Sequence, residues 1–264
     1  MCKSLLYFLV ALSFFFSVGA VSQDIISSEI LGSYETRFHY SGEEVIRNRA
    51  RNVRRALEKL NGAVIQPGKR LSYNRTLGPR IAERGWRPAK TILNGEIVID
   101  YGGGICQVSS TLHAAAIQSG LLIVHAQHHS RYMSYIDPGL DATVSWPNLD
   151  LVIQNPYSFP VRIHAWESHA GIASVEFIGS HREWDVEISH EIVERRRFQV
   201  ETIERNDMPS SYRHILEKGT NFLVLDRVIV STSRITGEIF IESERMQYES
   251  SPRLIEIGTA PESM

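Results

Sequence analysis

The chain has 264 residues, of which 43% are hydrophobic and 22% charged, with 18 glycines and 10 prolines. These proportions are typical of a globular protein with a hydrophobic core and exclude a collagen-like or low-complexity chain. A formal net charge of −2 lacks the basic excess of nucleic-acid-binding proteins, so we expect no nucleic-acid partner. The sequence contains two cysteines, Cys2 and Cys106, which excludes a disulfide framework.

Residues 1–20 have the features of a secretory signal peptide. Lys3 supplies a positive charge, residues 5–18 form a nearly continuous apolar run, and Val18-Gly19-Ala20 ends it with the small residues that a signal peptidase accepts. The run is shorter than the ~20 residues that a membrane-spanning helix needs, although an uncleaved anchor remains the alternative. The sequence predicts an exported protein (periplasmic, wall-associated or extracellular) that contacts a membrane only through an uncleaved signal segment.

Export would make Cys106 a candidate functional residue. Cleavage would remove Cys2 and leave Cys106 as a single cysteine in a compartment that tends to oxidise thiols. An odd cysteine there is either paired with another chain or kept for its reactivity. Cys106 is therefore the first candidate functional residue.

Helical spacing of apolar residues predicts a first helix over residues 41–60. Ser41 and Glu44 have the spacing of an S-x-x-E capping box, and Asn61-Gly62 is a good stop signal. The helix is rich in arginine, which indicates a solvated basic face, with an anionic wall polymer as the alternative partner.

Short β-like runs separated by turns follow over residues 63–101. Gly102-Gly103-Gly104 then leads into a second predicted helix, residues 105–119, which Gly120 would end. Strand-like stretches follow this helix at residues 121–126, 142–146, 149–154, 161–166 and 172–178.

The character of the chain changes near residue 180. Residues 184–204 are charged and β-prone, residues 222–232 are expected to pair with residues 238–244, and a last short strand is expected at residues 254–258. The sequence thus predicts an α+β fold with a mixed or antiparallel sheet. A helix carries the Gly-Gly-Gly-Ile-Cys motif at its N-terminus, and a small β-rich region follows at the C-terminus.

The string from Gly102 to Thr111 concentrates the residues that can do chemistry. Glycines let the backbone approach a ligand closely. A helix that begins near Ile105 places Cys106 in its first turn, where free N–H groups and the helix dipole favour a thiolate. The same N–H groups can stabilise an oxyanion during acyl transfer. A buried, unreactive cysteine is the structural alternative, but the glycines, the helix start and export together favour a nucleophile.

The polar face of this helix adds candidates for the same site. On a helical wheel one face carries Cys106, Ser109, Ser110 and His113, while the opposite face is apolar and is expected to pack. We expect oxyanion and substrate contacts from the glycine loop and the first turns of the helix. These candidates are Gly103, Gly104, Ile105, Gln107, Ser109 and Ser110.

A thiol nucleophile needs a histidine base. His113 lies two helical turns beyond Cys106, about 10 Å along the axis, which is too far for a hydrogen bond. Three histidines follow in the next strand-like segment and its loop, namely His125, His128 and His129. We select His129, with Asp141 to orient its ring and Asp137 as the alternative.

Zinc binding is the rival chemistry, because these three histidines and Cys106 are possible ligands. A strand would direct His128 and His129 to opposite faces, however, and the sequence has no H-E-x-x-H motif. We therefore expect no metal and no other cofactor.

Several motifs resemble, in order, those of the VanW domain family, which is named from vancomycin-resistance clusters and is common in exported bacterial proteins. These motifs are Pro67–Asn74, Leu77–Arg80, Glu83–Trp86, Gly102–Thr111, His129-Ser130, Tyr135, Pro138–Val144 and Asp150-Leu151. We identify residues 31–180 as a VanW domain. Residues 184–260 resemble, more loosely, the β module often appended to such domains, best at Ile257-Gly258-Thr259.

The resemblance implies a function. Some VanW domains are reported to act as L,D-transpeptidases, which join peptidoglycan stem peptides through a cysteine acyl-enzyme. By motif, this role falls on Cys106, with His129 as the matching histidine. The chain departs from the family at His113, where an aromatic residue is common, and at Trp86, where Tyr is commoner. The hypothesis is an exported cysteine acyltransferase. The alternative is a non-catalytic wall- or glycopeptide-binding module or a resistance accessory protein.

Overall fold

A computed structural model of the chain describes residues 28–93 and 96–261. The predicted signal peptide, residues 1–20, lies outside these residues. Within them, no helix combines the length and the apolar character that crossing a bilayer requires.

The N-terminal part is built on a four-stranded antiparallel sheet with the order β1-β9-β8-β2. Its strands are β1 (Glu29–Arg37), β2 (Val64–Ile65), β8 (Val161–His169) and β9 (Ile172–Gly179). β8 and β9 form the hairpin that the alternating apolar pattern indicates, and the turn between them places Gly171 at a φ of 80°. Alternate side chains of this hairpin, such as Ile163 and Val175, are fully buried, so one face of the sheet is directed into the core.

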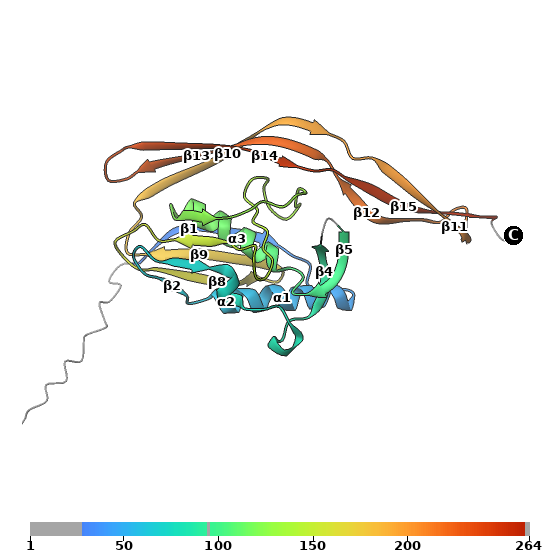
Figure 1. Cartoon of the computed structure of the whole chain (residues 1–264), viewed down its shortest axis with the longest axis horizontal. Coiled ribbons are helices and arrows are strands. Elements are labelled where there is room, and N and C mark those ends of the chain that lie inside the picture. Colours follow the sequence, from blue (N-terminus) through green and yellow to red (C-terminus); the bar gives the residue numbers. More distant parts are fainter. Residues whose placement is uncertain (1–27, 94–95, 262–264) are drawn as a thin grey trace, which may run out of the picture.

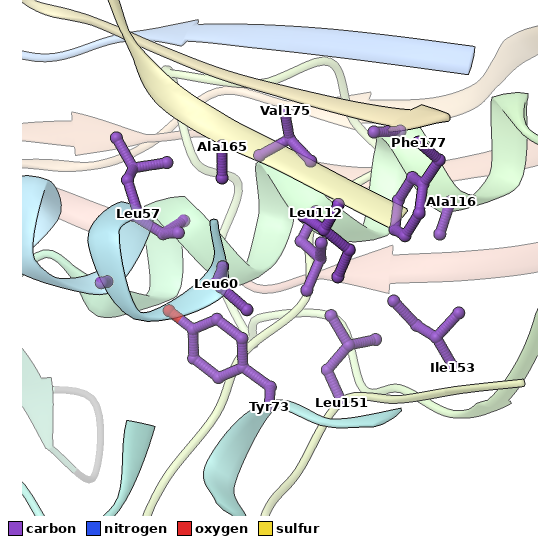
Figure 2. Close-up of a cluster of buried hydrophobic side chains, with 14 of the residues drawn as sticks. Leu57, Leu60, Tyr73, Leu112, Ala116, Leu151, Ile153, Ala165, Val175 and Phe177 are labelled. Atoms are coloured by element: carbon purple, nitrogen blue, oxygen red, sulfur yellow. The ribbon is translucent and has the colours of Figure 1, made fainter. Parts of the chain in front are cut away.

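Two helices complete this core. α1 (Glu44–Leu60) packs against β8, and α3 (Ile105–Gln118) packs against β1, β9 and α1. Figure 2 shows Leu57 and Leu60 of α1 meeting Leu112 of α3 and Phe177 of β9 in one apolar cluster. Each fully buried leucine contributes about 1.5–3 kcal/mol relative to an exposed one. Helical spacing of apolar residues therefore accounts for both helices.

Smaller elements surround this core. They are β3 (Arg70–Ser72), α2 (Tyr73–Leu77), a 3-10 turn (Ala82–Arg84), β4 (Pro88–Leu93), β5 (Glu96–Tyr101), β6 (Leu122–His125) and β7 (Val152–Gln154). β3, β7 and β6 form a three-stranded sheet, and β4 pairs with β5 directly before the glycine loop. This hairpin and α1 together fix where α3 begins.

Two local predictions are wrong. α1 begins at Glu44, three residues later than expected, and no side chain caps its start, so Ser41 and Glu44 do not form a capping box. The segment predicted as a strand over residues 142–146 contains only an isolated bridge between Ser145 and Leu149. Side chains of α3 use the backbone carbonyls of this segment, as at Ala142, and these groups are therefore not free to pair with a neighbouring strand.

The C-terminal strands, β10–β15, form two three-stranded sheets with the orders β10-β13-β14 and β11-β15-β12. Their bounds are β10 (Trp184–Arg196), β11 (Val200–Pro209), β12 (Arg213–Thr220), β13 (Phe222–Ser233), β14 (Ile239–Tyr248) and β15 (Ser251–Ala260). β13 and β14 pair antiparallel over the two runs predicted to form a hairpin, which confirms that prediction. Figure 1 shows β10, β13 and β14 lying across the α3 side of the molecule, with β11, β12 and β15 extending away from the helices.

One apolar cluster joins the C-terminal strands to the rest. Ile229 of β13 packs with Ala114 and Ile117 of α3 and with Leu140 of the loop that follows β6. The described residues are thus mainly β, with three α-helices, which agrees in outline with the α+β class.

Candidate active site

The start of α3 is held by a closely packed glycine loop. Gly102 and Gly104 have φ values of 85° and 107°, which side-chain-bearing residues rarely adopt. A Cβ at Gly103 would lie 2.6 Å from the Lys90 carbonyl oxygen, so only glycine fits there. Buried Asn52 of α1 donates from Nδ2 to the Gly103 carbonyl at 3.0 Å. The loop is therefore anchored to both β4 and α1.

This geometry leaves one backbone donor free beside the sulfur. The Ile105 N–H donates to the Gly102 carbonyl and the Gln107 N–H to the Gly104 carbonyl, each at 3.1 Å. In the part of the chain that the structure describes, the Cys106 N–H has no hydrogen-bond acceptor. Free N–H groups in a first helical turn attract negative charge.

Cys106 is a free, partly exposed cysteine, the second residue of α3. Its thiol donates to the Val144 carbonyl at 3.5 Å and lies 3.9 Å from Thr143 Oγ1. The side chain of His129 acts on the thiol through hydrogen bonding and charge, both of which lower its pKa. Polar groups therefore surround the sulfur of this partly exposed residue.

His129 is held by Asp141 through two hydrogen bonds. Its Nδ1 lies 2.7 Å from Asp141 Oδ2, and its backbone N–H donates to the same oxygen at 2.7 Å. The carboxylate fixes both the position of the ring and the nitrogen that carries the proton on that side. Cys106, His129 and Asp141 therefore form one hydrogen-bonded series, and the last two are buried.

The charges in this series support one another. Burial opposes ionisation of Cys106, but the hydrogen bond and charge of His129 outweigh it, and the pKa of the thiol lies below its ordinary value. Burial opposes protonation of His129, yet Asp141 and Cys106 raise its pKa to about 9. Burial also opposes ionisation of Asp141, but His129 holds the pKa of this carboxyl below its usual range. The three groups therefore favour one another's charged forms, a thiolate, an imidazolium and a carboxylate.

Tyr248, at the end of β14, extends the series and was not expected from the sequence. Its hydroxyl donates to Asp141 Oδ1 at 2.5 Å and accepts from the Gly139 N–H at 2.9 Å. The residue is fully buried, and its ring lies 5.1 Å from that of His128. Tyr248 follows Asp141 by more than one hundred residues, and no local motif marks it, so sequence spacing offered no signal.

The structure separates the other histidine and aspartate candidates from the sulfur. His125 is exposed on β6, and His128 Nδ1 lies 2.8 Å from the His129 carbonyl oxygen. His113 is buried 2.8 Å from the Leu140 carbonyl oxygen, and burial lowers its pKa to about 4. Asp137 accepts from the Tyr34 hydroxyl at 2.9 Å. Of the described histidines, only His129 hydrogen-bonds to Cys106.

The polar face of α3 is packed rather than open. Ser109 and Ser110 are fully buried. Each hydroxyl donates to the Cys106 carbonyl and to the Ala142 carbonyl, and the bond from Ser109 to Ala142 is 2.6 Å long. The buried amide of Gln107 donates to Thr36 Oγ1 and to the Arg37 carbonyl. These three side chains fasten α3 to its neighbours, and they do not line the exposed side of the sulfur. Gly103, Gly104 and Ile105 affect the site only through their backbone, which positions Cys106 at the start of α3.

Within residues 28–93 and 96–261, no group of three or more His, Cys, Asp or Glu side chains is arranged to hold a metal ion. A cleft of about 580 Å³ lies between residues 120–128 and the inner face of β13 and β14. Asp141 and His128 reach it, but Cys106 does not line it. The cleft therefore lies on the Asp141 side of the series, away from the sulfur.

The fold and the site define a β-rich α+β protein with a Cys-His-Asp arrangement at a helix start. Residues 48–177 match the family model described as "VanW like protein", and this segment contains all three residues. Residues 48–177 therefore form a VanW-like domain.

Two curated relatives match the chain in part. Over 140 residues it is 39% identical to "Uncharacterized protein YoaR" of Bacillus subtilis (strain 168), covering 53% of this chain and 45% of that protein. Over 125 residues it is 29% identical to "Vancomycin B-type resistance protein VanW" of Enterococcus faecalis (strain ATCC 700802 / V583), covering 44% of this chain and 45% of that protein. The chain therefore matches less than half the length of either relative.

Two solved structures of G5 domains also overlap the chain. One, titled "IgA1 Protease G5 domain structure", covers 31% of this chain and 99% of its own at 23% identity and a TM-score of 0.19. The other, titled "Crystal structure of HP0197-G5", covers 29% of this chain and 99% of its own at 13% identity and a TM-score of 0.15. With TM-scores this low, neither likeness supports an inference.

Proposed function

We propose that this protein is a cysteine acyltransferase of the cell envelope that acts on peptidoglycan stem peptides in the manner of an L,D-transpeptidase. The observation that carries the proposal is the series of Cys106, His129 and Asp141, in which Cys106 is a partly exposed residue at the start of α3. A nucleophile, a base and a group that orients the base are the parts that covalent acyl transfer requires.

In the first step, the Cys106 thiolate attacks a peptide carbonyl and forms a C–S bond. The negative charge that develops on the carbonyl oxygen is stabilised by the free Cys106 N–H and the positive end of the α3 dipole. The C–N bond then breaks, and the His129 imidazolium gives its proton to the departing amine. The product is a thioester on Cys106 with His129 neutral.

In the second step, an acceptor amine attacks the thioester carbonyl and passes a proton to His129. The C–S bond breaks as the new C–N bond forms, which restores the thiolate–imidazolium pair. Water in place of the amine would make the protein a peptidase. In both steps the Asp141 carboxylate accepts a hydrogen bond from His129 Nδ1–H and stabilises the imidazolium form.

The direct test is mass spectrometry of purified muropeptides incubated with the protein. We expect a cross-linked or trimmed product and an acyl adduct on the intact protein, and neither with Cys106→Ala. His125→Gln, which alters an exposed histidine remote from the sulfur, is the matched control and should keep both. Equal product from the wild type and Cys106→Ala would refute covalent catalysis and favour a non-catalytic wall-binding module.

Export is part of the proposal, because the substrate lies outside the cytoplasmic membrane. Its support is the signal-like pattern of residues 1–20. N-terminal sequencing of the protein recovered from the envelope or the medium is expected to begin after Ala20, and a protein retained in the cytoplasm would contradict it.

A further inference from the structure

Two arginines lie on either side of the glycine loop that leads to Cys106. Arg49 of α1 packs against Gly104, where an added Cβ would lie 2.9 Å from Arg49 Cγ, and it donates from Nη2 to Gln107 Oε1 at 2.7 Å. Arg80, which follows α2, packs in the same way against Gly102, with 2.7 Å between an added Cβ and Arg80 Cγ. The side chains of two arginines therefore border the glycine loop, and the guanidinium of Arg49 also reaches the first turn of α3.

Two aromatic rings lie against the guanidinium of Arg80. Its guanidinium carbon lies 6.0 Å from the ring centre of Tyr73 and 5.9 Å from that of Trp146. Tyr73 donates its hydroxyl to the Ile105 carbonyl at 2.8 Å, and Trp146 stands two residues after the carbonyl that accepts from the Cys106 thiol. Trp146 is 44% exposed, so the ring that contacts Arg80 is accessible to solvent.

Neither guanidinium has an acidic partner in the part of the chain that is described. Arg49 donates to a neutral amide, while Arg80 donates to the Gly78 carbonyl at 2.7 Å and to Asn74 Oδ1 at 2.6 Å. The Arg80 Nε is buried and has no hydrogen-bond partner. Asp150 acts on Arg80 only through its charge, without an ion-pair contact, and it accepts hydrogen bonds from Ser72 Oγ and from the Asn74 N–H.

Arg54, in contrast, forms a two-bond ion pair with Glu167, and Arg227 pairs with Glu244. Arg49 and Arg80 are half-buried, and desolvation lowers the pKa of both guanidinium groups, which the charge of Cys106 offsets only in part. Two such cations beside a reacting sulfur therefore require a compensating reason. An anionic ligand that completes the site on binding supplies one, since guanidinium groups recognise carboxylates through paired hydrogen bonds.

We propose that Arg49 and Arg80 form an anion-binding subsite beside Cys106, which holds a free carboxylate of the acyl donor close to the carbonyl that is attacked. The proposal rests on the proposed function, because it assumes that the ligand presents an electrophilic carbon to Cys106. It narrows the substrate class to peptides that carry a carboxylate within a few bonds of the scissile amide. Neutral, amidated donors would be poor substrates.

The test compares two alkylating agents of nearly equal size and different charge. Iodoacetate and iodoacetamide both lose iodide to the Cys106 thiolate as a C–S bond forms, but only iodoacetate carries a carboxylate. We expect the ratio of their second-order rate constants to exceed that of a small free thiol. Arg80→Gln and Arg49→Gln should each lower this ratio about tenfold, the effect of losing one hydrogen bond to a charged group. Both reagents react with the same thiolate, so a change in the thiolate fraction of a variant alters both rate constants equally and cancels in their ratio.

Two further variants make the result specific. Arg80→Lys keeps the charge without the planar fork and should give an intermediate ratio. Arg213→Gln removes an exposed arginine of β12, remote from the glycine loop, and should leave the ratio unchanged. Melting temperatures verify folding, and if Arg49→Gln does not fold, the two Arg80 variants decide.

The outcomes separate the subsite from the proposed function. A wild-type ratio equal to that of a free thiol, unmoved by either glutamine variant, overturns the subsite even if iodoacetamide reacts quickly. If iodoacetamide reacts slowly until the protein unfolds, Cys106 is not an activated thiol in the folded protein, and the proposed function is refuted. A ratio that falls only in the arginine variants beside the loop supports the subsite.

Discussion

The VanW-like domain and the C-terminal strands contribute to the same site in different ways. The domain supplies Cys106, His129 and Asp141 from segments rich in motifs and packed into the main core. The C-terminal strands are far more exposed, and almost every residue of β11 meets solvent. They nevertheless supply Tyr248, one of the fully buried side chains of the chain. A mainly exposed region can thus contribute a well-packed residue to a site.

The contact between the two regions is small and specific. Beyond the apolar cluster at Ile229, the Arg227 guanidinium donates to the Gly139 carbonyl at 2.7 Å, and the Glu249 N–H donates to the Ser130 carbonyl at 2.6 Å. These two hydrogen bonds connect the C-terminal strands to the loop that carries His129 and Asp141. We infer that the C-terminal strands order this loop, and the following predictions test how far each region controls the site.

The largest effect is expected from the domain itself, at His129. His129→Gln removes the imidazolium that lowers the pKa of the Cys106 thiol and protonates the departing amine. We expect acyl transfer to fall by about 100-fold or more, measured as product formed per unit time from muropeptides. Iodoacetamide labelling at neutral pH should slow in parallel. Undiminished transfer would remove His129 from the mechanism.

Asp141→Asn tests the residue that connects the two regions, because Asp141 bonds both to His129 of the domain and to Tyr248 of the C-terminal strands. Asp141 helps to raise the pKa of His129 to about 9, above its ordinary value of about 6.5, so the variant should move the basic limb of the pH–rate profile for acylation downward. The raised pKa of His129 and the lowered pKa of Cys106 change the stability in opposite directions as the pH rises, so the pH–rate profile is the sensitive readout of this variant.

Asp137→Asn is the matched control for this prediction. Asp137 also accepts a hydrogen bond from a tyrosine, Tyr34, but lies apart from His129. Denaturant unfolding at several pH values and the pH–rate profile should both resemble the wild type. A basic limb that stays in place in Asp141→Asn would contradict the role of Asp141.

Tyr248→Phe asks whether the C-terminal strands belong to the site. The variant keeps the packed ring but leaves Asp141 Oδ1 and the Gly139 N–H without a partner. We expect kcat to fall about tenfold, corresponding to about 1.5 kcal/mol, with a shift of the basic limb of the pH–rate profile. A purely structural role would lower the melting temperature and leave the pH–rate profile unchanged.

Tyr34→Phe provides the comparison, since Tyr34 likewise donates to a carboxylate, Asp137, from the first strand of the domain. It should alter neither kcat nor the pH–rate profile. Equal behaviour of the two tyrosine variants would mean that the C-terminal strands act only as a neighbouring surface.

The smallest effect is expected on the exposed face of the C-terminal strands. Arg245 pairs with Asp226 across β13 and β14 through two hydrogen bonds in solvent. Because exposed ion pairs are screened by water and salt, Arg245→Gln should leave acyl transfer unchanged and the melting temperature nearly so. A clear loss of activity would show that this face, and not only the buried Tyr248 contact, communicates with the site.

Local patterns in the sequence were sufficient for much of the architecture. The β8–β9 and β13–β14 hairpins follow from alternating apolar residues and a turn between them. α3 follows three glycines and ends before Gly120, because both signals act within one or two turns of the helix. The position of Cys106 in the first turn is of this kind, since it depends only on where the helix begins.

Long-range packing decided the rest. The sequence alone left three histidines open, and only the path of the loop after β6 brings His129 to the sulfur. The serines of α3 were expected at the site, yet they bond to carbonyls of residues 106 and 142, because buried hydroxyls must find partners. Tyr248 was not predicted, and Arg80 was noted only as part of a motif, because the partners of both are set by three-dimensional proximity, which spacing along the chain does not encode.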